Sequence, residues 1–260
     1  MNQIFDINRT LSLFKLNLSL NKKAILLAIA GFFGFVFITS FFVANNAPAL
    51  LNNMHTIFYF ILLYGGVALI AGQSYSHINS TEKSIAHLSL PASTFEKYIV
   101  PWLLSGIIWA IVAIGSYMLY SMLINGLWSG VMGFSYDAFN PFSLRMGPES
   151  ANQVYLPYFL MHSVFFLGAT AFQKHAIPKT LLTGFVVQSL FTFLNLIFIM
   201  ILFGGFGDFN VNINHPENWN PDFNYFFLDF LPRFIKTTFV YVVPVIFYVA
   251  AFFKLKEREV

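Results

Sequence analysis

Six apolar stretches, each able to cross a lipid bilayer as a helix, constrain this chain more than any other feature of its sequence. None has Asp, Glu, Lys or Arg in its central portion. A hydrocarbon layer of roughly 30 Å requires about 20 such residues, and an apolar helix crosses it with every backbone polar group paired. The predicted spans are residues 24–43, 56–72, 99–124, 154–173, 180–206 and 234–253. The sequence therefore predicts an all-α polytopic membrane protein, with residues 1–260 forming one transmembrane domain.

The basic residues beside the spans predict the orientation of the chain. Lys and Arg are retained on the cytoplasmic side during membrane insertion. Eleven of the 14 lie in segments on the side of the N-terminus: Arg9, Lys15, Lys22, Lys23, Lys83, Lys97, Lys174, Lys179, Lys254, Lys256 and Arg258. The other side has Arg145, Arg233 and Lys236. Because six spans return the chain to its starting side, we expect both termini in the cytoplasm.

The composition also restricts the class of partner. Only 10% of the residues are charged, compared with about 25% in a soluble domain. The net charge of +3 lies in short segments next to the spans, where it meets anionic lipid, so membrane lipid is an expected partner and nucleic acid is not. The chain has no Cys, which excludes a disulfide framework and a thiolate metal site. We expect no metal site and no cofactor.

Residues 1–23 predict an amphipathic helix lying in the inner membrane interface. Apolar residues recur there at spacings of three and four: Ile4, Ile7, Leu11, Phe14 and Leu18. Basic residues lie elsewhere on the helical wheel, as in interfacial helices. The alternative is a signal peptide, because an A-x-A pattern follows the first span. We reject it because the apolar run is longer than the roughly 7–15 residues of a signal-peptide core.

Residues 73–98 form the largest polar segment on the predicted cytoplasmic side. Ser93 and Glu96 have the spacing of a capping box, which predicts a helix that begins after Ser93 and enters the membrane. Glu82 suits the first turn of another short helix, and Pro91 separates the two. Two interpretations remain open at this point: an ordinary solvated loop, or a docking surface for a soluble partner.

The layout resembles the permease subunits of type-2 ABC transporters, especially compact six-span bacterial members. Three elements carry the resemblance: the basic leader R-T-L-S-L-F-K-L-N-L-S-L-N-K-K, the string L-S-L-P-A-S-T-F-E-K-Y-I, and a bulky acidic outer loop before the last span. The resemblance implies an elbow helix in the leader and a cytoplasmic ABC ATPase docked on the loop between the second and third spans. It assigns the coupling to Glu82, Lys83, Pro91, Ala92, Ser93, Glu96 and Lys97. A second copy, or a related permease, is the implied membrane partner, and a bacterial inner membrane is the implied location.

Few polar groups lie inside the predicted spans. His162 is the one ionisable residue at membrane depth, and we interpret it as hydrogen-bonded to a neighbouring helix, with a proton relay as the alternative. Gly184, Gln188, Thr192 and Asn195 share one face of the fifth span. This face either packs against another helix, which we favour, or lines a substrate path.

No catalytic motif is present. The chain has neither H-E-x-x-H nor the ATP-binding G-x-x-x-x-G-K-[ST], so energy for transport has to come from a separate subunit. Ser129 and His162 make a poor intramembrane protease pair, since Ser129 is expected near the outer surface. We therefore predict a non-enzymatic subunit of an ATP-driven exporter of apolar or amphipathic substrates. The alternative is a non-transporting scaffold or assembly factor that docks a different cytoplasmic partner.

Overall fold

The computed structural model describes residues 5–76, 91–133, 138–144, 155–172, 174–203, 225 and 230–258, and the regular structure within them is helical. The helices that contain the predicted spans are α1 (Ile7–Asn46), α2 (Leu51–Phe60), α3 (Gly66–Gln73), α5 (Thr94–Leu103), α6 (Trp109–Met132), α7 (Leu156–Ala171), α8 (Ala176–Phe203), α10 (Leu231–Thr237) and α11 (Val243–Arg258). Short 3-10 turns are η1 (Pro48–Leu50) and η5 (Pro141–Ser143). The predicted all-α class is confirmed for this part of the chain.

Five helical stretches of the described chain are long and apolar enough to cross a membrane: Lys22–Asn46, Pro48–Gln73, Thr94–Met132, Ala176–Phe198 and Leu231–Arg258. The predicted fourth span coincides with α7, which has 16 residues, fewer than the 17–25 or so of a typical spanning helix. The protein is thus a multi-pass membrane protein by length and composition. A count of six spans remains a prediction.

The N-terminal leader and the first span form one helix. Asp6 caps α1 by accepting hydrogen bonds from the backbone N–H groups of Asn8 and Arg9 at 2.8 and 3.2 Å, and the helix continues without interruption to Asn46. The structure thus joins the leader and the first span in one helix, and an interfacial position for residues 1–23 stays a prediction. The reason for the continuity is local, because the sequence has no Gly or Pro before Gly31 that would end or kink a helix.

Three spans contain a five-residue π-helical segment: η2 (Ile61–Gly65), η4 (Leu104–Ile108) and η9 (Thr238–Val242). Such wide turns leave backbone carbonyl groups in need of other donors. The Tyr158 hydroxyl donates to the carbonyl oxygen of Gly106 in η4 at 2.7 Å, and the Trp109 indole N–H donates to that of Leu63 in η2 at 3.3 Å. Side chains from neighbouring helices thus stabilise the irregular turns of two spans.

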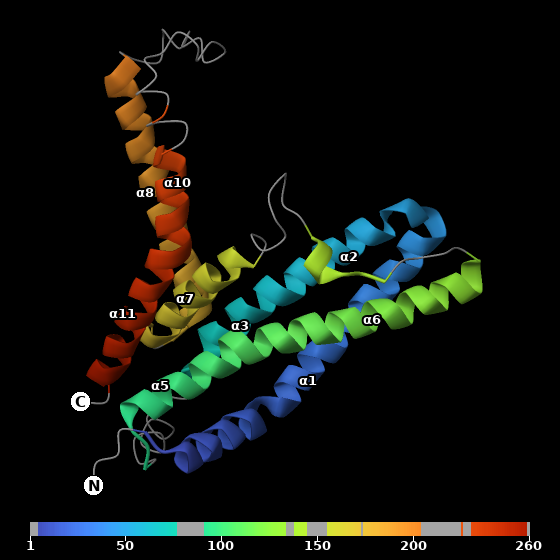
Figure 1. Cartoon of the computed structure of the whole chain (residues 1–260), viewed down its shortest axis with the longest axis horizontal. Helices are drawn as coiled ribbons and strands as arrows, with labels where there is room; N and C mark the ends of the chain where they lie inside the picture. The colour runs from blue at the N-terminus through green and yellow to red at the C-terminus, as the bar shows by residue number, and fades with distance from the viewer. Residues whose placement is uncertain are drawn as a thin grey trace.

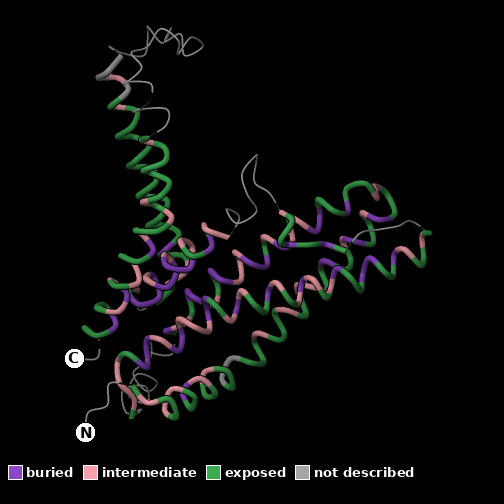
Figure 2. The backbone as a smooth tube through the Cα atoms, in the orientation of Figure 1, coloured by how far each residue is buried: buried purple, intermediate pink, exposed green. Residues whose placement is uncertain are grey.

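The helices form two groups that extend in different directions (Figure 1). One group contains α1, the α2–α3 run and the α5–α6 run, while α8 and α10 extend away from it. α7 joins the groups, since it packs against α3, α8 and α11. Buried residues follow α2–α3, α6 and α7, whereas α8 is exposed along most of its length (Figure 2). The core of the protein therefore lies in the first group and around α7.

Candidate functional site

Glu96 joins the first turns of α1 and α5. Its side chain has no exposed surface. Its Oε1 accepts hydrogen bonds from the backbone N–H of Asp6 at 2.6 Å and from the guanidinium of Arg9 at 3.2 Å. Its Oε2 accepts one from the backbone N–H of Ser93 at 2.9 Å. One carboxylate therefore holds two helices whose contacting residues are about 90 positions apart in the sequence.

The position of this carboxylate follows from helix capping. Asp6 and Ser93 are the N-caps of α1 and α5, and the Ser93 hydroxyl accepts from the Glu96 backbone N–H at 3.2 Å, which completes the predicted capping box. Glu96 thus accepts from the N–H groups of both N-cap residues. The positive ends of two helix dipoles favour a negative charge at this point. We name this cluster of Asp6, Arg9, Ser93 and Glu96 the inner junction.

The predicted coupling residues lie in different environments. Glu96 and Lys97 are buried, with 0% and 6% of their surface exposed, so neither offers a surface to a partner. Pro91 is exposed, and Ala92 and Ser93 are partly exposed. Phe95, 40% exposed, packs edge-on against Phe5 of the leader at 6.3 Å between ring centroids. Glu82 and Lys83 lie outside the described residues.

His162 joins three helical runs at membrane depth. Its ring has no exposed surface. Nε2 lies 2.9 Å from the Ser105 hydroxyl of η4, and Nδ1 lies 2.7 Å from the Tyr248 hydroxyl of α11. The ring also packs against Gly106, where an added Cβ would lie 3.2 Å from two of its atoms. His162 has the interhelical hydrogen bonds that the sequence interpretation favoured over a proton relay.

The same distances suit a nucleophile and a base, so a catalytic interpretation needs testing against the surroundings. Ser105 is fully buried, and its hydroxyl also donates to the Pro101 carbonyl oxygen at 2.7 Å. The Tyr248 hydroxyl has a second partner in the Phe159 carbonyl oxygen at 3.2 Å. Ser129, the residue considered from the sequence, donates from its hydroxyl to the backbone carbonyl oxygen of Asn125 in its own helix at 2.7 Å. The cluster therefore satisfies its own hydrogen bonds and ties η4, α7 and α11 together.

A second buried histidine was not singled out at membrane depth from the sequence. His55 lies in α2 and has no exposed surface. It fell outside the predicted span, which begins at residue 56, because α2 begins earlier, at Leu51. Its ring nitrogens lie 3.2 Å from the Tyr117 hydroxyl and 3.0 Å from Asn125 Oδ1. The sequence signal that could have indicated this contact was Asn125, a polar residue in the apolar helix α6. This cluster ties α2 to α6.

The polar stripe of the fifth span lies on the exposed surface of α8. Gly184, Gln188, Thr192 and Asn195 are all exposed. The Thr192 hydroxyl donates to the Gln188 carbonyl oxygen at 2.9 Å, so it is satisfied within the helix. The structure does not bring the stripe together with His162, which is buried on α7. The two sets of predicted membrane-depth residues are separate features.

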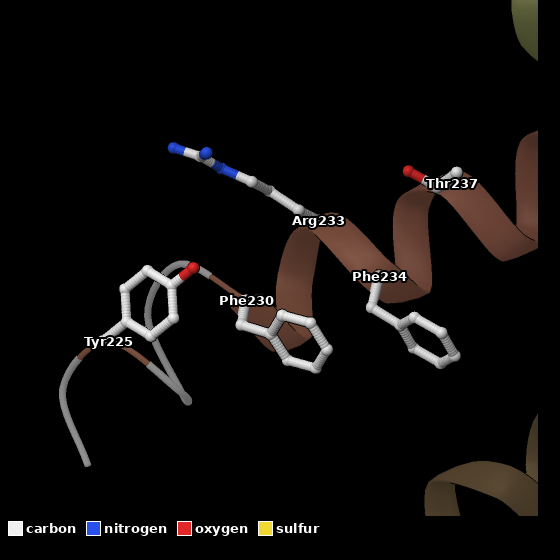
Figure 3. Close-up of a pocket in the computed structure, with 5 residues that line it drawn as sticks. All are labelled: Tyr225, Phe230, Arg233, Phe234 and Thr237. Carbon is white, nitrogen blue, oxygen red and sulfur yellow. The ribbon is translucent and has the colours of Figure 1, made fainter. Parts of the chain in front are cut away.

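A shallow cavity of about 220 Å³ lies beside α10. It is lined by Tyr225, Phe230, Arg233, Phe234 and Thr237. The rings of Phe230 and Phe234 stack with centroids 5.9 Å apart, and the Arg233 side chain extends away from them (Figure 3). Aromatic and basic side chains at a span end are typical of anchoring at headgroup level. The cavity contains none of the predicted site residues.

The comparisons with known proteins identify no family for this chain, so its function is inferred from its sequence and geometry. The chain matches no family model, no curated protein and no solved structure. Among the residues that the structure describes, no three His, Cys, Asp or Glu side chains are grouped so as to hold a metal ion.

Proposed function

We propose that this chain is the membrane-spanning subunit of a type-2 ABC transporter, driven by a separate cytoplasmic ATPase. It would export an apolar or amphipathic substrate across a bacterial inner membrane, with both termini in the cytoplasm and six spans. A second copy or a related permease would complete the pore. The proposal is supported by the five apolar helices and by the lack of an ATP-binding motif in the sequence.

The observation that carries the proposal is the inner junction. A docking site that transmits force needs a surface for the partner and a firm connection to the spans behind it. Residues 91–95 supply a partly exposed surface at the start of α5. Glu96 directly behind them is buried and bonded to α1. A push on this surface therefore acts on α1 and α5 together.

This geometry revises the role of two residues within the coupling region. Glu96 and Lys97 are buried, so they position the docking surface and do not contact the ATPase. Phe95 and Pro91, which are exposed, are the residues that would contact it. Coupling would then proceed from the ATPase to residues 91–95 and through Glu96 to both helices.

The test is a purification from native membranes in a mild detergent, followed by mass spectrometry and an ATP hydrolysis assay. The variant is Phe95→Asp, which places a charge on the exposed surface and leaves Ser93 and Glu96 intact. The control is Phe142→Asp, which changes a phenylalanine that is 60% exposed on η5, on the predicted outer side. We expect a P-loop ATPase, with hydrolysis activity, to copurify with the unmodified chain and with Phe142→Asp, and to be lost with Phe95→Asp.

Two outcomes contradict the proposal. If the intact chain is recovered without any P-loop ATPase, the scaffold interpretation takes its place. If the ATPase copurifies equally with Phe95→Asp, the docking surface lies elsewhere and the inner junction has lost its assigned role. Measuring the amount of each variant in the membrane separates lost docking from lost folding.

A further inference from the structure

α8 packs on the rest of the described chain through its first turns. Ile177 fits against Gly72 of α3, where an added Cβ would lie 2.6 Å from its side chain. Thr180, 6% exposed, fits against Gly168 of α7, where an added Cβ would lie 1.8 Å from its hydroxyl. Beyond this base, every residue in 181–196 is exposed. We call this part of α8 the shaft.

The shaft has two chemically different faces. Most of its residues are apolar and suited to lipid, for example Val186, Leu190 and Phe193. The opposite face bears Gly184, Gln188, Thr192 and Asn195, which recur at spacings of four, four and three. Gln188 lies near the middle of the 28-residue helix, so its amide is at membrane depth.

The two amides of this face have no hydrogen-bond partner in the described chain. The Thr192 hydroxyl is paired within the helix, but the side chains of Gln188 and Asn195 are exposed and make no such bond to described residues. Lipid tails offer neither donors nor acceptors, so an amide facing them loses its hydrogen bonds to water without replacement. A protein surface with donors and acceptors at the same depth would supply them.

We propose that the shaft pairs with the shaft of a second copy of this chain, through the face that contains Gly184, Gln188, Thr192 and Asn195. A side-chain amide is both donor and acceptor, so it complements an identical amide. Two copies inserted in the same orientation are related by a twofold axis along the membrane normal, which places equal residues at equal depth. Gln188 then meets Gln188, and Asn195 meets Asn195.

The glycine of the stripe allows the close approach that this pairing needs. An added Cβ at Gly184 meets nothing within 4 Å, unlike Gly72 of α3 and Gly168 of α7, against which the base of α8 packs. Small residues at a membrane helix interface let two backbones come near enough for side-chain hydrogen bonds to form. The pairing rests on the proposed function, which includes a second copy, and names the surface through which the two copies meet. Because cross-linking of the two copies needs no ATPase, its failure is distinguishable from a failure to copurify the ATPase.

The test exploits the absence of Cys from the natural sequence. Thr192→Cys introduces one thiol on the stripe and keeps both amides, and Leu190→Cys introduces one on the opposite face at nearly the same depth. Native membranes containing either variant are treated with a lipid-permeant oxidant and run on a non-reducing gel. We expect a disulfide-linked dimer from Thr192→Cys, at least about tenfold above Leu190→Cys, because only facing Cα atoms within roughly 7 Å can be bridged.

A second variant separates specific pairing from random collision. Gln188→Leu with Asn195→Leu, added to Thr192→Cys, removes both amides and leaves the helix apolar. We expect the dimer yield to fall several-fold at equal membrane levels of the protein. Equal yields from Thr192→Cys and Leu190→Cys overturn the proposal, as does a yield unchanged by removal of the amides. A shaft bound to a different membrane protein would give no disulfide-linked dimer from Thr192→Cys, which also overturns it.

Discussion

The two buried histidines and the two shaft amides are polar groups in apolar helices, but their surroundings differ. His55 and His162 each have both ring nitrogens within 3.2 Å of another helix's side chain. Gln188 and Asn195 are exposed, without a hydrogen-bond partner in the described chain. The two histidines find their partners within the packed helices, whereas the shaft amides have none among the residues that the structure describes.

The glycines also differ in how closely other atoms pack against them. Gly66 of α3 lies against the ring of Trp109, where an added Cβ would be 2.0 Å from the nearest ring atom. Gly184 of the shaft and Gly65 of η2 have nothing within 4 Å of an added Cβ. Gly66 is therefore a steric requirement of the core, while Gly65 and Gly184 have free space in the single chain.

The largest effect is expected from Gly66→Ala. The new methyl group would force the Trp109 ring, which is 6% exposed and packed in the core, out of its place. Overpacking of this kind costs about 3 kcal/mol of unfolding free energy. The measurement is unfolding of the purified protein by SDS titration in mixed micelles. Gly65→Ala and Gly184→Ala are the controls, and we expect neither to destabilise the monomer, because Ala favours the helix.

A loss of unfolding free energy for Gly184→Ala as large as that for Gly66→Ala would contradict the expected difference between the shaft and the packed helices. It would show that the shaft is packed within one chain. If Gly66→Ala and Gly65→Ala were equally tolerated, Trp109 would have room to move, and the core around α3 would be looser than its burial indicates.

An intermediate effect is expected from Glu96→Ala. The substitution removes the acceptor of three hydrogen bonds, two from backbone N–H groups and one from the Arg9 guanidinium. We assign little free energy to the ion pair between Glu96 and Arg9, because the Arg9 side chain is 38% exposed and water screens its charge. The lost caps and hydrogen bonds amount to about 2 kcal/mol. Unfolding free energy, with hydrogen exchange of the first turns of α1, is the measurement.

The matched control for that variant is Glu257→Ala. Glu257 accepts from Lys254 at 2.7 Å, but both side chains are largely exposed, at 66% and 48%. Such a pair contributes less than about 0.5 kcal/mol. Exchange should rise at the start of α1 for Glu96→Ala only. Unchanged exchange there would mean that α1 is held to α5 by other contacts, and the inner junction would lose its structural role.

The sequence predicted the local features of this fold and missed contacts between distant residues. Hydropathy located each apolar segment that is helical in the structure, because lipid demands long apolar helices. The Ser93–Glu96 capping box was readable because it involves neighbours three apart. The bonds from Glu96 to Asp6 and Arg9 span about 90 positions. No periodicity encodes such a contact.

The membrane-depth histidines illustrate the same limit. That His162 would bond a neighbouring helix followed from the cost of an unpaired polar group in lipid. Its partners Ser105 and Tyr248 lie 57 and 86 positions away, so they follow only from how the helices pack. The continuity of the leader with the first span is a local feature, because the absence of Gly and Pro before Gly31 favours one continuous helix.

The smallest effect on folding is expected from Gln188→Leu, compared with Asn125→Leu. The Asn125 side chain is 2% exposed and bonds to the buried His55 ring, so its loss costs about 2 kcal/mol. Gln188 is exposed, so its replacement changes the unfolding free energy of the monomer by less than about 0.5 kcal/mol. Both are measured at a protein-to-detergent ratio low enough to keep the chain monomeric. Equal costs would place Gln188 in an intrachain contact, and the shaft would then need no second copy to satisfy its amides.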